Sequence, residues 1–168
     1  MLERYFFERP VLKVARDLLG KYLVRRYRGK VTAYMITEVE AYDGPKDKAC
    51  HASRGRTERN KVMFGEAGHF YVYFVYGMHW MLNIVTGKPG YPAAVLIRGV
   101  EGVNGPARVC KKLHINKKLN GKLAAHKSGL WFEDGGIKIP AEKIKRTPRI
   151  GVAYAKEWAM KPYRFVFD

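Results

Sequence analysis

Cysteine is scarce in this sequence, with only Cys50 and Cys110 among 168 residues. Two cysteines so far apart give no disulfide framework, and their scarcity fits a reducing compartment. The five histidines are scattered, and no CxxC, HxxxH or HExxH spacing occurs. Because metal sites need such clusters, we expect neither a structural metal nor any other cofactor.

Long apolar runs are also absent, and none reaches the length of a membrane-spanning helix. Charges interrupt the first residues, Met1–Arg9, too early for the core of a signal peptide. We find no convincing basic amphipathic helix that would hold the protein on a membrane surface. The sequence therefore predicts a soluble, intracellular protein that does not contact membranes.

Acidic residues are few, since 15 Asp and Glu face 32 Lys and Arg and the formal net charge is +17. A compact protein repels itself at that charge, so a polyanionic partner is the favoured explanation. The alternative is a solvated, lysine-rich surface on an enzyme with a neutral substrate. With 47% hydrophobic and 13% aromatic residues, the chain is expected to form one globular domain over residues 1–168.

The stretch from residue 68 to residue 85 is the most aromatic and β-branched part of the sequence. This composition is typical of strands. Tyr76-Gly77 lies near its middle, and glycine readily adopts the positive φ that reverses a chain. We therefore expect a hairpin with strands near residues 70–75 and 80–85.

Folding this hairpin in half places Tyr73 close to Leu82 and Asn83 and leaves Tyr76 at the tip. An exposed aromatic side chain on a rigid tip favours insertion into a partner. Simple packing into the core is the alternative.

The rest of the chain predicts an α+β fold, a curved antiparallel sheet with helices packed to one side and a protruding β-hairpin. No internal repeat or domain boundary is visible. The expected elements are a helix between Pro10 and Gly20, strands at 21–27, 31–42, 92–99 and 163–167, a helix from Pro106 to Leu113, and a small hairpin from 130–132 and 137–139. Lys143, Lys145, Arg146 and Arg149 are interpreted as part of a basic surface.

The strand at residues 31–42 places Glu38, Glu40 and Tyr42 on one face, because strand side chains alternate. For Glu38 we favour an exposed position paired with nearby lysines. Glu40 lies nearer the strand end and beside an aromatic residue, where catalytic groups tend to emerge.

A polar run at residues 54–60 contains Arg54, Arg56 and Arg59. Such a run can simply be solvated. Arginine forks beside Thr and Asn also suit phosphate groups, so these three side chains are candidates for contact with a DNA backbone.

Several segments, taken in order, resemble the alkyladenine (3-methyladenine) DNA glycosylase family over nearly the whole chain. They are Ala15-Arg-Asp-Leu-Leu-Gly20, Thr37-Glu-Val-Glu-Ala-Tyr42, His51-Ala-Ser-Arg-Gly-Arg-Thr57, Arg59-Asn60, Met63-Phe64, Tyr71-Val-Tyr73 with Tyr76-Gly-Met78, Asn83 and Gly105-Pro-Ala-Arg108. Each motif alone is weak, whereas the ordered series is specific. The sequence departs from the family at Glu58, where the family has proline, and in a shorter link from Arg98 to Gly105.

The resemblance implies a base-flipping enzyme, because chemistry on a base inside a duplex requires taking it out of the stack. Tyr76 would fill the gap as a wedge, and Glu40 would activate the attacking water and stabilise an oxocarbenium-like sugar. By resemblance, the remaining roles are Tyr42 on one face of the base, His51 and Tyr73 on the other, Asn83 as gatekeeper against guanine, and Arg98 holding the water and a phosphate.

The function implied is that of a monofunctional repair enzyme acting as a monomer on double-stranded DNA inside the cell. Its substrates would be the 3-methyladenine, 7-methylguanine, hypoxanthine and ethenoadenine class of damaged purines, and its product an abasic site. Two alternatives are a non-catalytic nucleic-acid-binding protein and a hydrolase of free nucleosides. The first gives no reason for Glu40 beside Tyr42, and the second none for the charge.

Overall fold

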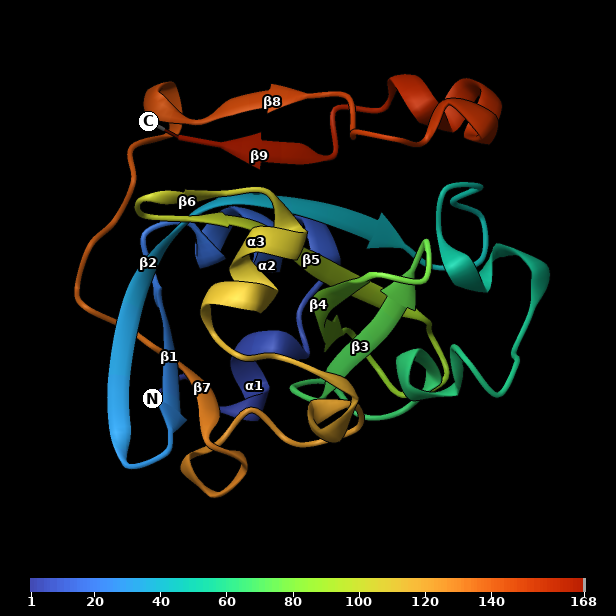
Figure 1. Ribbon diagram of the computed structural model, residues 1–168. Helices are drawn as coiled ribbons and strands as arrows, with labels where there is room; N and C mark the ends of the chain where they lie inside the picture. Colours follow the sequence, from blue (N-terminus) through green and yellow to red (C-terminus); the bar gives the residue numbers. More distant parts are fainter. Residues whose placement is uncertain (168) are drawn as a thin grey trace.

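The computed structural model describes residues 1–167 and arranges them around one strongly curved antiparallel sheet (Figure 1). Over this range the sheet has nine strands, ordered β3-β4-β5-β2-β1-β7 along its main path, with β6 on β5 and β9 between β2 and β8. The strands are β1 Tyr22–Tyr27, β2 Lys30–Asp43, β3 Phe70–Val75, β4 His79–Thr86, β5 Ala93–Val100, β6 Val103–Asn104, β7 Leu130–Glu133, β8 Lys145–Thr147 and β9 Arg164–Val166. The predicted α+β class is confirmed.

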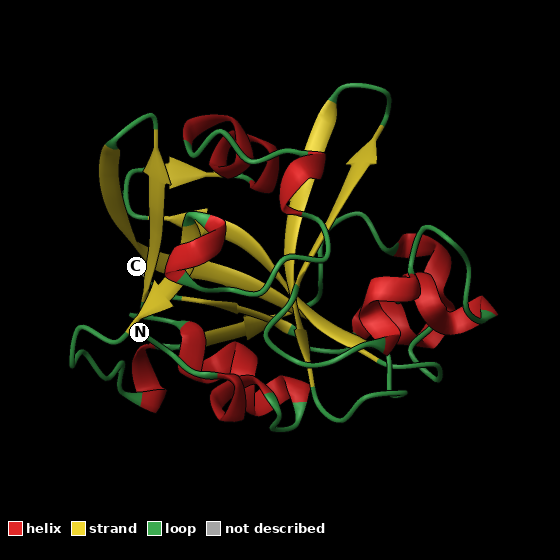
Figure 2. Cartoon of the chain, turned by 90° about the horizontal axis from the view of Figure 1, so that it is seen from below, coloured by secondary structure: helices red, strands yellow, loops and turns green. Residues whose placement is uncertain are grey.

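The helical segments are short, and Figure 2 shows them grouped around the strands that cross the middle of the molecule. The α-helices are α1 Arg4–Phe7, α2 Val11–Leu18 and α3 Pro106–Lys112. The 3-10 helices are η1 His51–Arg54, η2 Lys61–Phe64, η3 Lys117–Leu119, η4 His126–Ser128, η5 Ala141–Lys143 and η6 Ala153–Met160. Among residues 1–167 no helix has both the length and the apolar character that a membrane crossing needs.

The main core lies on one face of the sheet, where α2 and α3 both pack. Their apolar residues join side chains of β1 to β5, β7 and β9 in one buried cluster. Helix α2 ends as predicted, because Gly20 directly after its C-cap has a φ of 80°, a conformation that glycine adopts at little cost.

Strand β2 contributes side chains to this core and to the opposite face of the sheet. Ile36 and Val39 are both fully buried in the core, although residues three positions apart on a regular strand face opposite sides. The pairing with β5 is irregular between them, at Glu38, and the original register is regained at Val39. Beyond this irregularity, Glu40 and Tyr42 lie on the face away from the core.

The C-terminal part of the chain covers the outer face of the sheet near the end of β2. In Figure 1, β8, β9 and η6 form a layer above the rest of the molecule. Strand β9 pairs with residues 38–40 of β2, so this layer lies directly beside Glu40.

The small hairpin expected from residues 130–132 and 137–139 does not form. Only β7 is a strand there, and it pairs with β1. The Asp134 carboxylate accepts hydrogen bonds from Lys21 Nζ and Gly136 N. This turn directs the chain across Gly20, where Ile139 packs, instead of back along β7.

Candidate active site

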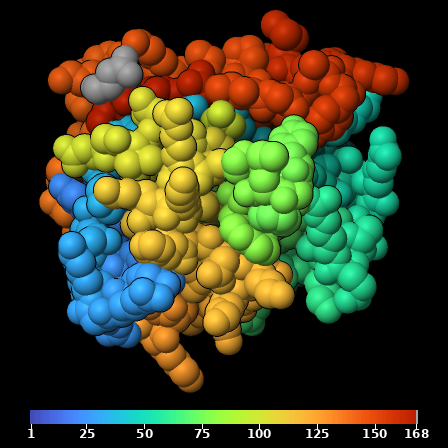
Figure 3. All heavy atoms as spheres, in the orientation of Figure 1, coloured from blue at the N-terminus to red at the C-terminus, as the bar shows by residue number. Residues whose placement is uncertain are grey.

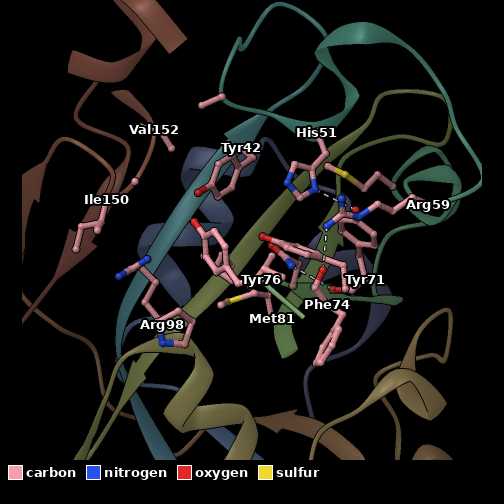
Figure 4. Close-up of a pocket in the computed structure, with 18 of the residues that line it drawn as sticks. Tyr42, His51, Arg59, Tyr71, Phe74, Tyr76, Met81, Arg98, Ile150 and Val152 are labelled. Carbon is pink, nitrogen blue, oxygen red and sulfur yellow. Dashed lines mark hydrogen bonds between the residues drawn. The ribbon is translucent and has the colours of Figure 1, made fainter. Parts of the chain in front are cut away.

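A cavity of about 550 Å³ opens on the sheet face opposite the main core (Figure 4). Its walls come from the end of β2, the β3–β4 hairpin, β5, the η1 region and residues 150–154. Seven of the predicted site residues line it: Tyr42, His51, Arg59, Tyr73, Tyr76, Asn83 and Arg98. We call this cavity the aromatic pocket.

Glu40 lies directly behind the wall of the aromatic pocket and is completely buried. Its Oε2 accepts a hydrogen bond of 2.9 Å from Tyr42 Oη, and its Oε1 accepts one of 2.7 Å from Ile150 N. Arg98 Nε lies 3.5 Å from the same Oε1. Burial raises the pKa of Glu40, while the Arg98 charge and the two hydrogen bonds act in the opposite direction. A carboxylate with a raised pKa in a cavity wall is suited to act as a base.

Tyr42 separates Glu40 from the cavity and is held from two sides. Its hydroxyl donates to Glu40, and the Arg149 guanidinium lies 4.8 Å from its ring centroid. Burial, followed by the Glu40 charge, raises the pKa of Tyr42 well above its usual value. The hydroxyl therefore stays protonated and remains a hydrogen-bond donor at neutral pH.

His51 and Tyr73 form the aromatic wall predicted for the site, and the structure adds Tyr71 to it. The His51 and Tyr73 ring centroids are 4.5 Å apart, and those of Tyr71 and Tyr73 are 5.1 Å apart. His51 Nδ1 also lies 3.1 Å from Tyr71 Oη. Burial, followed by the nearby Arg59 charge, lowers the pKa of His51, which favours the neutral imidazole at pH 7.

Asn83 lines the pocket but is not opposite Tyr73, so the predicted register of the hairpin is wrong. Asn83 pairs with Tyr71, and Tyr73 pairs with Met81. The shift keeps the predicted face, because side chains repeat every second residue. Asn83 is 3% exposed, and its Nδ2 donates a hydrogen bond of 3.1 Å to Tyr71 O.

Arg98 belongs to a charged group beside Glu40. Its Nε donates to Glu38 Oε1 at 3.1 Å, and Arg164 Nε donates to the same oxygen at 2.6 Å. Glu38 is therefore not an exposed residue paired with lysines, as its sequence position suggested. Its side chain is 12% exposed and is held by two arginines, because β9 covers this part of β2.

The hairpin tip has the geometry expected from the sequence. Tyr76 and Gly77 have φ values of 53° and 65°, and Met78 N donates to Val75 O, a pattern typical of a type I′ turn. Tyr76 is 88% exposed and is one of the residues that line the aromatic pocket. A positive φ at a tyrosine is strained, and such strain often marks a functional position.

The three arginines of the polar run occupy different positions. All three are exposed, but only Arg59 lines the aromatic pocket, where it donates to Phe74 O and lies 5.3 Å from the Tyr73 ring centroid. Arg54 lines a neighbouring depression with Lys46, Lys48 and Lys156. Arg56 lies on the loop between η1 and η2.

Arg149 is part of the site, although its sequence context indicated a basic surface. Its side chain is fully buried, and its two terminal nitrogens bind the Asp47 carboxylate at 2.5 and 2.8 Å. It also donates to Ala41 O on β2 and to Trp158 O on η6. The following residue, Ile150, then donates its backbone N–H to Glu40.

Sequence reasoning missed these residues because neither Arg149 nor Asp47 belongs to a local pattern. Residues 150, 151, 152 and 154, which line the pocket, were missed for the same reason. No periodicity or motif indicates that a C-terminal segment crosses a strand more than a hundred residues earlier in the chain. Over its described residues, the structure contains no cluster of three or more His, Cys, Asp or Glu side chains able to hold a metal ion.

A buried carboxylate behind the aromatic pocket, in a strongly basic protein, suggests a hydrolase that binds a flat base and acts on a polyanion. Comparison with known proteins identifies the kind of hydrolase. A family model described as Methylpurine-DNA glycosylase (MPG) matches residues 5–104 and 100–168.

Curated relatives agree with this match, and their names give them provisionally as 3-methyladenine DNA glycosylases. One from Methanocella arvoryzae is 48% identical and aligns with 98% of this chain and 91% of its own length. Relatives from Legionella pneumophila (strain Corby) and Myxococcus xanthus are 45% and 43% identical, over 98% and 97% of this chain and 92% and 88% of their own.

The chain therefore belongs to the methylpurine-DNA glycosylase family. This confirms the family resemblance and the predicted class of enzyme, which is a DNA glycosylase of DNA repair. It also confirms the prediction that the substrate is DNA.

Proposed function

We propose that the protein removes alkylated and deaminated purines, the 3-methyladenine, 7-methylguanine, hypoxanthine and ethenoadenine class, from duplex DNA. It flips the damaged nucleotide into the aromatic pocket and hydrolyses the N-glycosidic bond, which leaves an abasic site. The observation that carries the proposal is the position of Glu40, fully buried behind the pocket wall and bound to Tyr42 and Ile150.

In this proposal the aromatic side chains recognise the flipped base. Tyr42 covers one face of the base, and His51 with Tyr73 covers the other. Stacking contributes about 1–3 kcal/mol per base. A positively charged alkylated purine gains further attraction to electron-rich rings. Since burial holds the pKa of His51 below its usual value, a neutral imidazole faces the cationic base without repulsion.

Glu40 and Arg98 carry out the hydrolysis. Glu40 removes a proton from the attacking water and stabilises the positive charge that develops on the sugar. Among the described residues, Arg98 donates side-chain hydrogen bonds only from Nε. Its two terminal nitrogens are therefore available to bind the water and an adjacent phosphate. Glu38, which is itself bound by Arg164, holds the Arg98 guanidinium in place.

The hairpin and the basic surface hold the opened duplex. Tyr76 enters the minor groove at the tip of a rigid turn and fills the gap left by the flipped base. Arg54, Arg56 and Arg59 contact the DNA backbone. The protein acts as a monomer, and residues 1–168 work as a single domain.

Incubation of the protein with duplexes that carry single hypoxanthine, ethenoadenine or alkylated purines tests the function. The expected product in EDTA is an abasic site, with strand breaks only after alkali. Cleavage of free nucleosides without a duplex would favour the nucleoside hydrolase alternative. Trapping of a covalent protein–DNA adduct with borohydride would contradict a monofunctional mechanism, because it reports a lysine Schiff base.

A further inference from the structure

A second depression, of about 590 Å³, lies between α3 and the β1–β2 hairpin. We call it the α3 groove. Every charged side chain that lines it among the described residues is basic, and it contains no Asp or Glu. The basic residues are Arg25, Lys30, Arg108, Lys111, Lys112 and His114.

The floor of the α3 groove is fixed by hydrogen bonds and ring contacts. Arg25 donates to the backbone oxygens of Leu113 and Gly129 at 2.9 and 3.0 Å. The rings of Tyr27 and His114 stack with centroids 4.3 Å apart and an interplanar angle of 15°. A rigid floor lets the groove bind a ligand without first ordering its own backbone.

The rim of the groove carries cations that are available to a partner. These are Lys30, Arg108 and Lys111, and all three are exposed. None of them forms an ion pair with an acidic side chain of residues 1–167. By contrast, Lys48 and Lys61 elsewhere on the surface pair with glutamates. Unpaired cations around a concave surface attract and concentrate an anion.

Helix α3 contributes residues to both the groove and the aromatic pocket. Pro106, the first residue of this helix, lines the pocket, whereas Arg108 and Lys111 line the groove. A helix of seven residues is about 10 Å long. Figure 3 shows the tip of the β3–β4 hairpin, α3 and the β1–β2 turn on the same face of the molecule, in green, yellow and blue.

We propose that the α3 groove binds the sugar-phosphate backbone of the duplex arm that flanks the base held in the aromatic pocket. The proposal rests on the proposed function, because the flipped base fixes where the duplex lies. A duplex carries one negative charge per about 1.7 Å of its axis, so the length of α3 spans several phosphates. The groove would thus fix the register of the duplex without reading its sequence.

Arg108→Gln with Lys111→Gln removes two rim charges, and glutamine preserves helix propensity. The matched control is Lys13→Gln with Arg16→Gln, which removes two exposed charges from α2. Affinity for a lesion-containing duplex is measured at several salt concentrations. The groove variant should reduce the slope of log affinity against log salt by about 1.8, or roughly 0.9 per lost phosphate contact, and the control should leave it unchanged.

The length of the duplex arms beside the lesion tests where the two removed charges act. The groove variant should weaken binding to a duplex with arms of about one helical turn, roughly 10 base pairs, and spare a duplex of the same total length in which the lesion lies at one end, so that the arm on the groove side is missing. Single-turnover excision at saturating enzyme should be unchanged. Equal salt slopes for both variants, equal losses on both duplexes, or a larger loss for single-stranded RNA than for duplex DNA would overturn the proposal.

Failure of the proposed function can be recognised separately. If the wild-type protein excised no damaged purine, the groove variant and the control could still be compared by the salt dependence of their affinity for a lesion-free duplex. A reduced salt slope in the groove variant alone would then support a backbone site, and identical slopes would exclude it.

Discussion

At the scale of single residues, the proposed reaction depends on the Glu40 carboxylate. Glu40→Gln keeps Oε1 as the acceptor for Ile150 N, and the new amide can donate to Tyr42 Oη. The substitution thus preserves the packing but removes the base and the negative charge. Excision should fall by about 10²–10⁴-fold, the usual contribution of a general base, while binding to lesion DNA is retained.

Glu38→Gln is the matched control, because Glu38 contacts the same Arg98 on the same strand. It should reduce excision much less, since Arg98 keeps its position near Glu40. Single-turnover rates, measured with saturating enzyme, separate chemistry from binding. A near-normal rate in Glu40→Gln, with a large loss in Glu38→Gln, would transfer the catalytic role to Glu38.

The raised pKa of Glu40 also predicts how rate and stability depend on pH. A base must be ionised, so excision should decline as pH falls through a pKa above the ordinary value of 4.5. For stability the sign is opposite. A carboxyl whose folded pKa is raised stabilises the fold below its unfolded pKa, and this contribution is lost as pH rises through the folded pKa.

Thermal melts test this linkage. Glu40→Gln should raise Tm relative to wild type at neutral pH, and the difference should shrink in acid, where Glu40 is protonated. A difference in Tm that is the same at both pH values would show that ionisation of Glu40 does not cost stability.

Asn83 is proposed to exclude guanine, which differs from adenine by an amino group at the purine 2-position. Stacking is indifferent to this group, so rejection needs a steric or unsatisfied-donor penalty on one edge of the base. Asn83→Ser should enlarge the aromatic pocket at this edge and increase release of undamaged guanine, with a modest effect on the excision of hypoxanthine.

The alternative is that Asn83 has a structural role, because the Asn83 amide on β4 donates a hydrogen bond to Tyr71 O on β3. If that hydrogen bond is the main role, the serine variant should melt earlier and lose activity on every substrate alike. Excision of guanine and of hypoxanthine, measured beside thermal melts, distinguishes the two roles.

At the scale of elements, the sequence was most informative where local chemistry decides the structure. Tyr76-Gly77 marked the hairpin turn because few sequences tolerate two successive positive φ values. The register was wrong because the second strand was expected to begin near residue 80, whereas the turn ends at Met78 and His79 already pairs with Val75.

Exposure of charged residues was harder to predict. Arg149 is buried against Asp47, but nothing in its neighbours distinguishes it from surface arginines. Glu38 is covered by β9, a strand whose position is set by the path of the whole C-terminal segment. Such pairings depend on tertiary contacts and leave no periodic signal in the sequence.

The hairpin itself is expected to act in opening the duplex. Tyr76→Ser removes the exposed ring and leaves the I′ turn in place. It should weaken lesion capture more in duplex than in single-stranded DNA, where less unstacking is needed. Val31→Ser, which removes an exposed apolar side chain on β2, is a control. Equal losses on both substrates would show that Tyr76 contributes only packing.

At the scale of the whole molecule, the Arg149–Asp47 pair joins two distant parts of the chain. Asp47 follows β2, Arg149 precedes η6, and the guanidinium also binds backbone oxygens of β2 and η6. This places the C-terminal layer against the sheet and brings Ile150 N to Glu40. We therefore infer that Arg149 is a positioning residue for the proposed base.

Arg149→Met should destabilise the fold by about 3–5 kcal/mol, because it leaves the Asp47 carboxylate buried without its partner. It should also move the acid limb of the excision profile to higher pH. Loss of the Arg149 charge, and of the fixed Ile150 donor, removes two influences that lower the pKa of Glu40. Measurements belong at temperatures where thermal melts show the variant to be folded.

Two further variants decide between positioning and mere stability. Lys21→Met breaks another ion pair, with Asp134, and should lower Tm without moving the acid limb. Arg149→Lys keeps a charge near Glu40 but cannot bind both Asp47 oxygens with a planar fork, so it should restore part of the pH profile and less of the stability. If Arg149→Met lowered Tm while its acid limb matched that of wild type, the pair would hold the fold together but play no part in setting the pKa of Glu40.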